Sequence, residues 1–162
     1  MKLRYSIGPL LATILFVWGC SGQKPPPDLP KLYPIVLEFT QKKQPLADAS
    51  VTIIPTGADT RWFSGGNTDS QGRLAPKTHG KYPGLAEGEY RILVSKTEAD
   101  PASIKRTSKN EEETQYYDYY HLADPKYSGI SSTPLTIKVQ GKESFTFELG
   151  APVRVKIVPK DI

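Results

Sequence analysis

Residues 135–149 read LTIKVQGKESFTFEL, and apolar and polar side chains alternate along most of this stretch. The apolar members are Leu135, Ile137, Val139, Phe145, Phe147 and Leu149. A period of two residues places such side chains on one face of a β-strand, and Gly141 and Lys142 between the two sets are typical of a turn. The stretch therefore predicts two strands that each bury one face.

The same alternation recurs in the rest of the chain. Its apolar sets are Ile35, Leu37 and Phe39; Ala49, Val51 and Ile53; Tyr90, Ile92 and Val94; and Val153, Val155 and Ile157. Turn-like residues at 42–45, 69–72 and 87–88 separate the strands, and no stretch has a sustained helical period. We therefore expect an all-β, antiparallel β-sandwich of about seven strands, formed as a single domain by residues 35–158.

The first 19 residues have the layout of a secretory signal peptide. Lys2 and Arg4 make the N-terminus basic, and residues 7–18 are almost wholly apolar. This run is shorter than the roughly 20 residues that a membrane-spanning helix needs. We therefore expect residues 1–19 to be a processing segment outside the fold.

Cys20, the only cysteine, directly follows this segment. With Val17 and Gly19 before it, Cys20 resembles the lipobox of bacterial lipoproteins, which implies a lipid-modified N-terminal cysteine and the membrane as a partner. Ser21 stands where an aspartate would retain an enteric lipoprotein in the inner membrane. The resemblance thus favours the outer membrane or periplasmic face of the cell envelope. The alternative is an ordinary signal peptide, cleaved elsewhere, that leaves a free thiol.

Prolines dominate the next segment, and five of them lie between residues 25 and 34. Proline fixes φ and removes a backbone donor, so residues 20–34 are expected to be the lipid attachment site and an extended spacer that rises about 3.1 Å per residue.

The charge argues against a nucleic-acid partner. The chain has 21 basic and 17 acidic residues, and removal of Lys2 and Arg4 leaves 19 against 17. A nucleic-acid-binding face needs a clustered excess of basic residues.

The order of several segments resembles the carboxypeptidase regulatory-like, or transthyretin-like, domain of small bacterial lipoproteins. The segments are LADASVTIIP (46–55), NTDSQGRL (67–74), GLAEGEYRILVS (84–95) and DPKYSGISSTPLTIKVQGKESFTFEL (124–149). The resemblance implies a seven-stranded transthyretin-like sandwich without catalytic activity. Residues 97–120, a Tyr- and Glu-rich insertion, and the additional strand at 151–158 lie outside the pattern of that family.

Aromatic residues are the candidate ligand contacts. They are Trp62 and Phe63 in DTRWFSGGN, and Tyr116, Tyr117, Tyr119 and Tyr120 in the insertion. Exposed aromatic side chains suit a glycan or a protein partner. The alternatives are that Trp62 and Phe63 cover one end of the core, and that the tyrosines are ordinary strand residues beside a solvated run of acids.

No motif predicts a metal, a cofactor or a catalytic residue. Two interpretations are open for the acids Glu111, Glu112, Glu113 and Asp118: a cation site or a solvated loop. We expect Asp69 to lie in a tight turn rather than in a calcium-binding loop. His79 and His121 are expected to be exposed and unpartnered. A small envelope hydrolase that uses either histidine is the alternative class.

These patterns together predict a lipid-anchored cell-envelope protein with a non-enzymatic binding or structural module. A hydrolase and a glycan-binding protein that uses the aromatic loops remain the alternatives, and an envelope protein or a glycan is the expected partner.

Overall fold

The computed structural model describes residues 25–57, 61–109 and 112–157, with the backbone alone for residues 105–109 and 112–116. The described chain is mostly strand, and its only helical element is the 3-10 helix η1 (Pro125–Ser128). The strands are β1 (Leu32–Tyr33), β2 (Ile35–Gln41), β3 (Gln44–Pro45), β4 (Ser50–Pro55), β5 (Ser64–Asn67), β6 (Arg73–Leu74), β7 (Lys77–Thr78), β8 (Tyr82–Pro83), β9 (Leu85–Ala86), β10 (Gly88–Ser95), β11 (Thr97–Lys109), β12 (Glu112–His121), β13 (Thr136–Val139), β14 (Glu143–Glu148) and β15 (Val155–Lys156).

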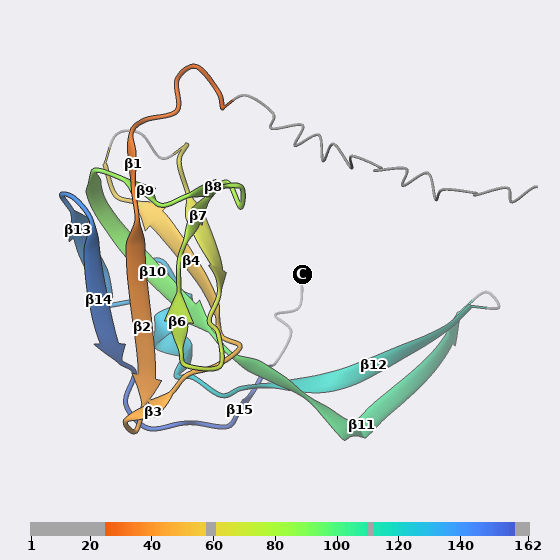
Figure 1. Ribbon diagram of the computed structural model, residues 1–162. Helices are drawn as coiled ribbons and strands as arrows, with labels where there is room; N and C mark the ends of the chain where they lie inside the picture. The colour runs from red at the N-terminus through yellow and green to blue at the C-terminus, as the bar shows by residue number, and fades with distance from the viewer. Residues whose placement is uncertain (1–24, 58–60, 110–111, 158–162) are drawn as a thin grey trace, which may run out of the picture.

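Two sheets pack face to face and form the body of the molecule (Figure 1). One sheet has the order β13-β10-β4-β5-β7-β8, and the other has the order β14-β2-β3, with β6 also paired to β2. Side chains from both sheets meet in one apolar core, in which Phe39 and Leu37 from β2 lie with Ile53 from β4 and Ile92 from β10. The predicted all-β sandwich is thus confirmed.

The two-residue period correctly predicts which side chains face the core. Along β2, Ile35, Leu37 and Phe39 are buried while Val36 and Glu38 are exposed. The same alternation of burial holds for β4, β10 and β13. Burial of one face per strand supplies the main driving force for a fold of this kind, at about 25 cal/mol per Å² of apolar surface.

One strand pair differs from the antiparallel expectation. β14 runs parallel to β2, with Phe145 beside Leu37 and Phe147 beside Phe39. The other strand pairs of the described chain are antiparallel. The chain reaches this arrangement because β13 and β14 belong to different sheets, so the turn between them crosses from one layer of the sandwich to the other.

The insertion at 97–120 forms a long hairpin that extends from the body (Figure 1). We call β11 and β12 together the arm. The ladder has a bulge after Asp100, where Ser103 Oγ accepts from the amide of Asp118 at 2.7 Å and donates to the carbonyl of Asp100 at 2.7 Å. β15 pairs with β12 at the base of the arm, so the strand predicted at 151–158 joins the arm rather than the sandwich.

The described part of the predicted spacer lies against the body. Leu32 and Tyr33 form β1 and pair with Ala86 and Leu85 of β9, and Asp28 forms an ion pair with Arg61 at 3.0 Å. β1 and β9 form a two-stranded sheet of their own, so residues 28, 32 and 33 contact residues that follow the predicted spacer.

Candidate binding groove

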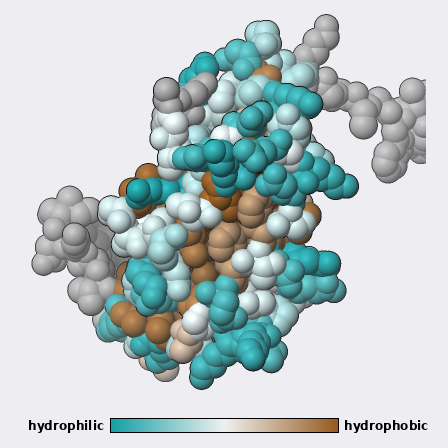
Figure 2. Space-filling view, turned by 90° about the vertical axis from the view of Figure 1, so that its left-hand side faces the viewer, coloured by the Kyte–Doolittle hydropathy of each residue, from teal (hydrophilic) through white to brown (hydrophobic). Residues whose placement is uncertain are grey.

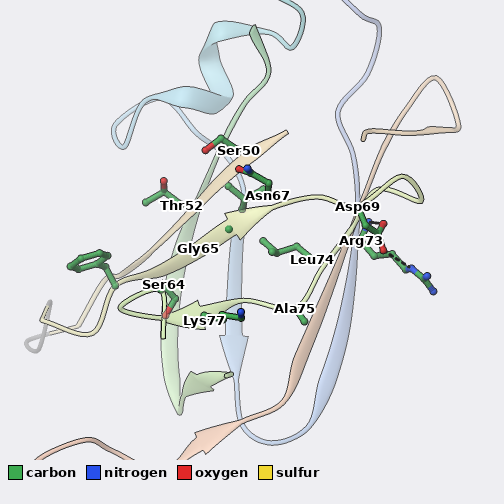
Figure 3. A pocket seen from close by; sticks show the side chains of 14 residues that line it. Ser50, Thr52, Ser64, Gly65, Asn67, Asp69, Arg73, Leu74, Ala75 and Lys77 are labelled. Atoms are coloured by element: carbon green, nitrogen blue, oxygen red, sulfur yellow. Dashed lines mark hydrogen bonds and ion pairs between the residues drawn. The ribbon is translucent and has the colours of Figure 1, made fainter. Parts of the chain in front are cut away.

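The outer face of β4, β5 and β7 contains a gap in its row of side chains. Thr52 lies opposite Gly65, and Gly65 lies opposite Lys77. Opposed residues of antiparallel strands present their side chains on the same face. Because Gly65 has no side chain, the space between Thr52 and Lys77 stays open. This space belongs to an open groove of about 670 Å³ (Figure 3).

Small and polar residues make up much of the wall of this groove. Ser50 lies opposite Asn67 in the next row of the same face. Phe63, which directly precedes β5, also lines the groove and is 54 % exposed. A Cβ on Gly65 would lie 2.4 Å from the carbonyl oxygen of Val51, which is closer than real Cβ atoms approach. The close approach of β4 to β5 therefore requires the glycine on which the groove depends.

A tight turn fixes the charged end of the groove. The Oδ1 of Asp69 accepts from the amides of Gln71 and Arg73, both at 2.8 Å, and these bonds lower the pKa of Asp69, with the amide of Arg73 the larger cause. Gly72 follows with φ of 73°, a conformation that glycine adopts without strain. The predicted turn is thus confirmed. Asp69 also lies 3.6 Å from Nε of Arg73, as the dashed lines in Figure 3 indicate.

The two aromatic residues of DTRWFSGGN have different environments. Trp62 is 8 % exposed, and its ring stacks on His79 at 5.0 Å between centroids. Phe63 is exposed and also contacts the ring of His79, at 5.1 Å. Trp62 is thus buried against His79 and outside the main core cluster, whereas Phe63 remains accessible from the groove.

The tyrosines at 117, 119 and 120 do not line this groove. Tyr117 and Tyr119 are exposed, and Tyr120 lies under the guanidinium of Arg154 at 3.9 Å from Cζ to the ring centroid. The side chain of Tyr116 lies outside the described residues, as does Cys20. The aromatic residues that the sequence predicts as ligand contacts therefore lie at two separate places in the fold.

The histidines differ in part from the expectation. His79 is exposed, but it is not unpartnered, because its ring contacts both aromatic neighbours and its Nε2 donates to the carbonyl oxygen of Arg61 at 2.6 Å. A carbonyl oxygen only accepts, so this bond places a proton on Nε2 of His79. His121 is half-buried at the end of β12, and in the part of the chain that the structure describes it makes no side-chain hydrogen bond to a serine or an aspartate.

Two serines that directly precede a glycine in turn-like sequence, Ser64 and Ser128, are hydrogen-bonded within the fold. Ser64 is buried and shares a hydrogen bond with Thr78 at 2.9 Å, and Ser128 donates to the carbonyl of Pro125 at 2.7 Å. Among residues 25–57, 61–109 and 112–157, no group of three or more His, Cys, Asp or Glu side chains is arranged to hold a metal. Glu111 and the side chains of Glu112 and Glu113 lie outside the described residues.

The groove was missed at the level of sequence, although a signal was present. Gly65 and Gly66 follow Phe63 between two apolar runs, and glycine inside a strand often marks a site where another backbone or a ligand approaches closely. The strand itself was not predicted, because SGGN has no apolar alternation. Pairing with β4 and β7 determines this strand.

Comparison with known proteins adds no relative. No protein-family model, curated protein or solved structure matches the chain. The resemblance to the transthyretin-like domain therefore stays a prediction. None of the helices in the described ranges has the length and apolar character needed to cross a membrane.

Proposed function

We propose that this chain is a lipid-anchored cell-envelope protein whose sandwich is a non-enzymatic binding module. The observation that carries the binding role is the open groove over Gly65, whose volume of about 670 Å³ lies within the usual range of roughly 300–1,000 Å³ for ligand sites. The order of basic residues, apolar run and Cys20 supports the lipid anchor.

The chemistry of the groove favours a glycan as the ligand. The hydroxyls of Ser50 and Thr52 and the amide of Asn67 can each donate and accept hydrogen bonds, as sugar hydroxyls require. Phe63 offers an exposed aromatic ring against which the apolar face of a sugar packs. The groove is open, so it suits a segment of a longer chain better than an enclosed small molecule.

Retention on purified peptidoglycan tests the binding role. Thr52→Trp places a large side chain over Gly65 from an exposed position, and Phe63→Ala removes the exposed ring. Each is expected to reduce retention of the full chain at least tenfold. Thr136→Trp is the matched control, because Thr136 is also an exposed strand residue on the outer face of the same sheet but does not line the groove. Equal retention by all four proteins would exclude this groove.

Mass spectrometry of the mature N-terminus tests the anchor separately. The proposal expects the first residue to be Cys20 with acyl chains attached, and it expects Cys20→Ala to release the protein from the membrane fraction. An unmodified Cys20 thiol in a protein that fractionates as soluble would overturn the anchor and leave the groove experiment unaffected.

A further inference from the structure

β14 leaves one edge of its sheet unpaired in the described structure. It is the terminal strand of the order β14-β2-β3. The amide of Leu149 donates to Thr40 on β2, so the odd-numbered residues of this strand direct their backbone groups toward β2. Alternate residues of a strand direct these groups to opposite sides. Ser144, Thr146 and Glu148 therefore direct their N–H and C=O groups to the free edge.

This edge lacks several of the features that usually block strand addition, and its two charged residues, Glu143 and Glu148, lie at its ends. The sequence of β14 is ESFTFE, which has neither a proline nor a lysine, and its ladder with β2 has no bulge. The edge strand of the arm, β11, has both Pro101 and a bulge after Asp100. Proteins protect exposed edges with such features. Of these two edge strands, β14 is the one open to a partner.

Apolar side chains lie beside the same edge. Phe145 and Phe147 pack against the core but are only half-buried, and Leu135 is likewise half-buried against the core. Figure 2 shows an apolar stripe down the middle of the side on which β13 and β14 lie. A strand added to β14 would cover part of this stripe while it satisfied the backbone groups of the edge.

We propose that the occupant is a second copy of this chain, with its β14 antiparallel to the first and a two-fold axis through Thr146. In this register Thr146 faces its own copy, and Ser144 faces Glu148 of the other copy. All three residues have outward backbone groups, so each opposed pair exchanges two N–H···O=C bonds.

The side chains of β14 fit this register as well as its backbone does. Phe145 of one copy lies opposite Phe147 of the other on the core side, and aromatic pairs across strands are favourable. Each Glu148 faces a serine, so no two acids are directly opposed. A shift that places Glu148 opposite Glu148 would bring like charges together and would also leave Ser144 and Thr146 unpaired. The strand is therefore self-complementary in this register.

The anchor proposed above makes a weak contact of this kind effective. A single strand pair buries less area than a stable soluble dimer needs. Two copies held in one membrane meet at a high effective concentration, which raises the occupancy of a weak contact without any new interaction. The inference thus rests on the proposed function for its setting but not for its geometry.

Thiol crosslinking in intact cells tests the register. Lipid attachment consumes the thiol of Cys20, so the full chain with Thr146→Cys has a single reactive thiol. A short bismaleimide is expected to convert it to a homodimer at least five times more efficiently than the control Glu89→Cys. Glu89 is also an exposed strand residue, but it lies on β10 of the other sheet and does not line the proposed ligand groove.

Each outcome decides the inference. A T146C yield no higher than that of E89C overturns it, and so does a T146C adduct with another protein in place of the homodimer. A crosslinked dimer of the parent chain would instead show that the Cys20 thiol is free, which contradicts the anchor. In that case the crosslinking yield of T146C is measured in a Cys20→Ser background, with purified and concentrated protein, and is compared with the yield of E89C in the same background.

Discussion

The sandwich and the arm are both built from β-strands, but different interactions hold them together. In the sandwich, Leu37, Phe39, Ile53 and Ile92 have no exposed surface. In the arm, none of the side chains described at 97–104 and 117–121 is buried. This described part of the arm therefore has no core of its own, and its stability depends on its ladder and on contacts at its base.

Ion pairs, rather than an apolar core, connect the strands at the base of the arm. Asp100 and Asp118 lie directly opposite each other on β11 and β12, which by itself is unfavourable. The segment around β15 brings a cation to each: Lys156 Nζ lies 2.6 Å from Asp118, and Arg154 lies 3.9 Å from Asp100 and stacks over Tyr120. The two cations near the short strand β15 thus offset the repulsion between Asp100 and Asp118.

We therefore expect the sandwich and the arm to unfold separately. Burial makes the sandwich a cooperative unit, whereas regions with few buried contacts open at low free energy.

Removal of a core ring should have the largest effect. Phe39 has no exposed surface and stacks on Phe147 at 5.4 Å between centroids. Phe39→Ala is expected to lower the free energy of unfolding by about 3–5 kcal/mol, measured by urea denaturation. The arm control, Tyr119→Ala, is expected to change it by less than about 0.5 kcal/mol because that side chain is exposed. Similar losses in both variants would contradict the separation of the two regions.

A buried hydroxyl in the sandwich should matter next. Thr68 Oγ1 donates to the carbonyl of Leu46 at 2.6 Å and accepts from the amide of Ala49 at 2.9 Å. Thr68→Val keeps the shape but leaves both backbone groups unsatisfied, so the expected loss is about 1–3 kcal/mol in the same assay. Thr136→Val, at an exposed strand position, is the control and should be nearly neutral. An unchanged urea midpoint for Thr68→Val would argue against the role of this hydroxyl.

A change at the base of the arm should act locally. Lys156→Gln removes the cation beside Asp118, so amide exchange at Ile157, which bonds the carbonyl of Tyr119, should become several-fold faster while exchange in β10 stays unchanged. The hydrogen bond to Asp118 raises the pKa of Lys156. A raised pKa in the folded state means that the stabilisation is present at neutral pH and is lost as the pH rises through that value. Equal acceleration in β10 would show that arm and body open together.

Sequence predicted the burial pattern of the body but not the neighbours of its strands. A two-residue period states which face a side chain takes, and Ile35, Leu37 and Phe39 follow it. It carries no information on which strand lies alongside, so the parallel pairing of β2 with β14 could not be read from it. The groove could not be predicted for the same reason, because it depends on Thr52, Gly65 and Lys77 lying in one row across three strands.

The arm was the least predictable region. The insertion was recognised, but its acids and tyrosines favoured a solvated loop as much as a strand. Its pairing depends on a bulge that Ser103 stabilises and on β15 from far along the chain. Neither contact has a local signature. Interactions between distant polar groups thus determine the arm, whereas local apolar alternation determines much of the body.

The smallest effect on stability is expected from Glu148, the last residue of β14. Glu148 accepts from Thr40 Oγ1 at 2.7 Å and from the amides of Lys42 and Lys43 at 2.8 and 3.2 Å. Of these bonds, that from Thr40 is the largest cause of the lowered pKa of Glu148. Lys42 and Lys43 have φ of 49° and 61°, so the carboxylate also holds a turn in the left-handed region.

The pH dependence follows from the direction of that shift. A carboxyl group whose pKa is lower in the folded state stabilises the fold above its ordinary value, which is 4.5 here, and this stabilisation is lost as the pH falls through the folded value. Glu148→Gln should therefore lower the urea midpoint slightly at neutral pH and leave a smaller difference from the parent at about pH 3, where glutamate is mostly protonated. The opposite pH dependence is expected for Lys156. Its stabilising contribution is lost at alkaline pH, and this loss affects only the arm. If E148Q lowered the midpoint equally at both pH values, the bonds to the turn would not depend on the charge, and acid would not distinguish the sandwich from the arm.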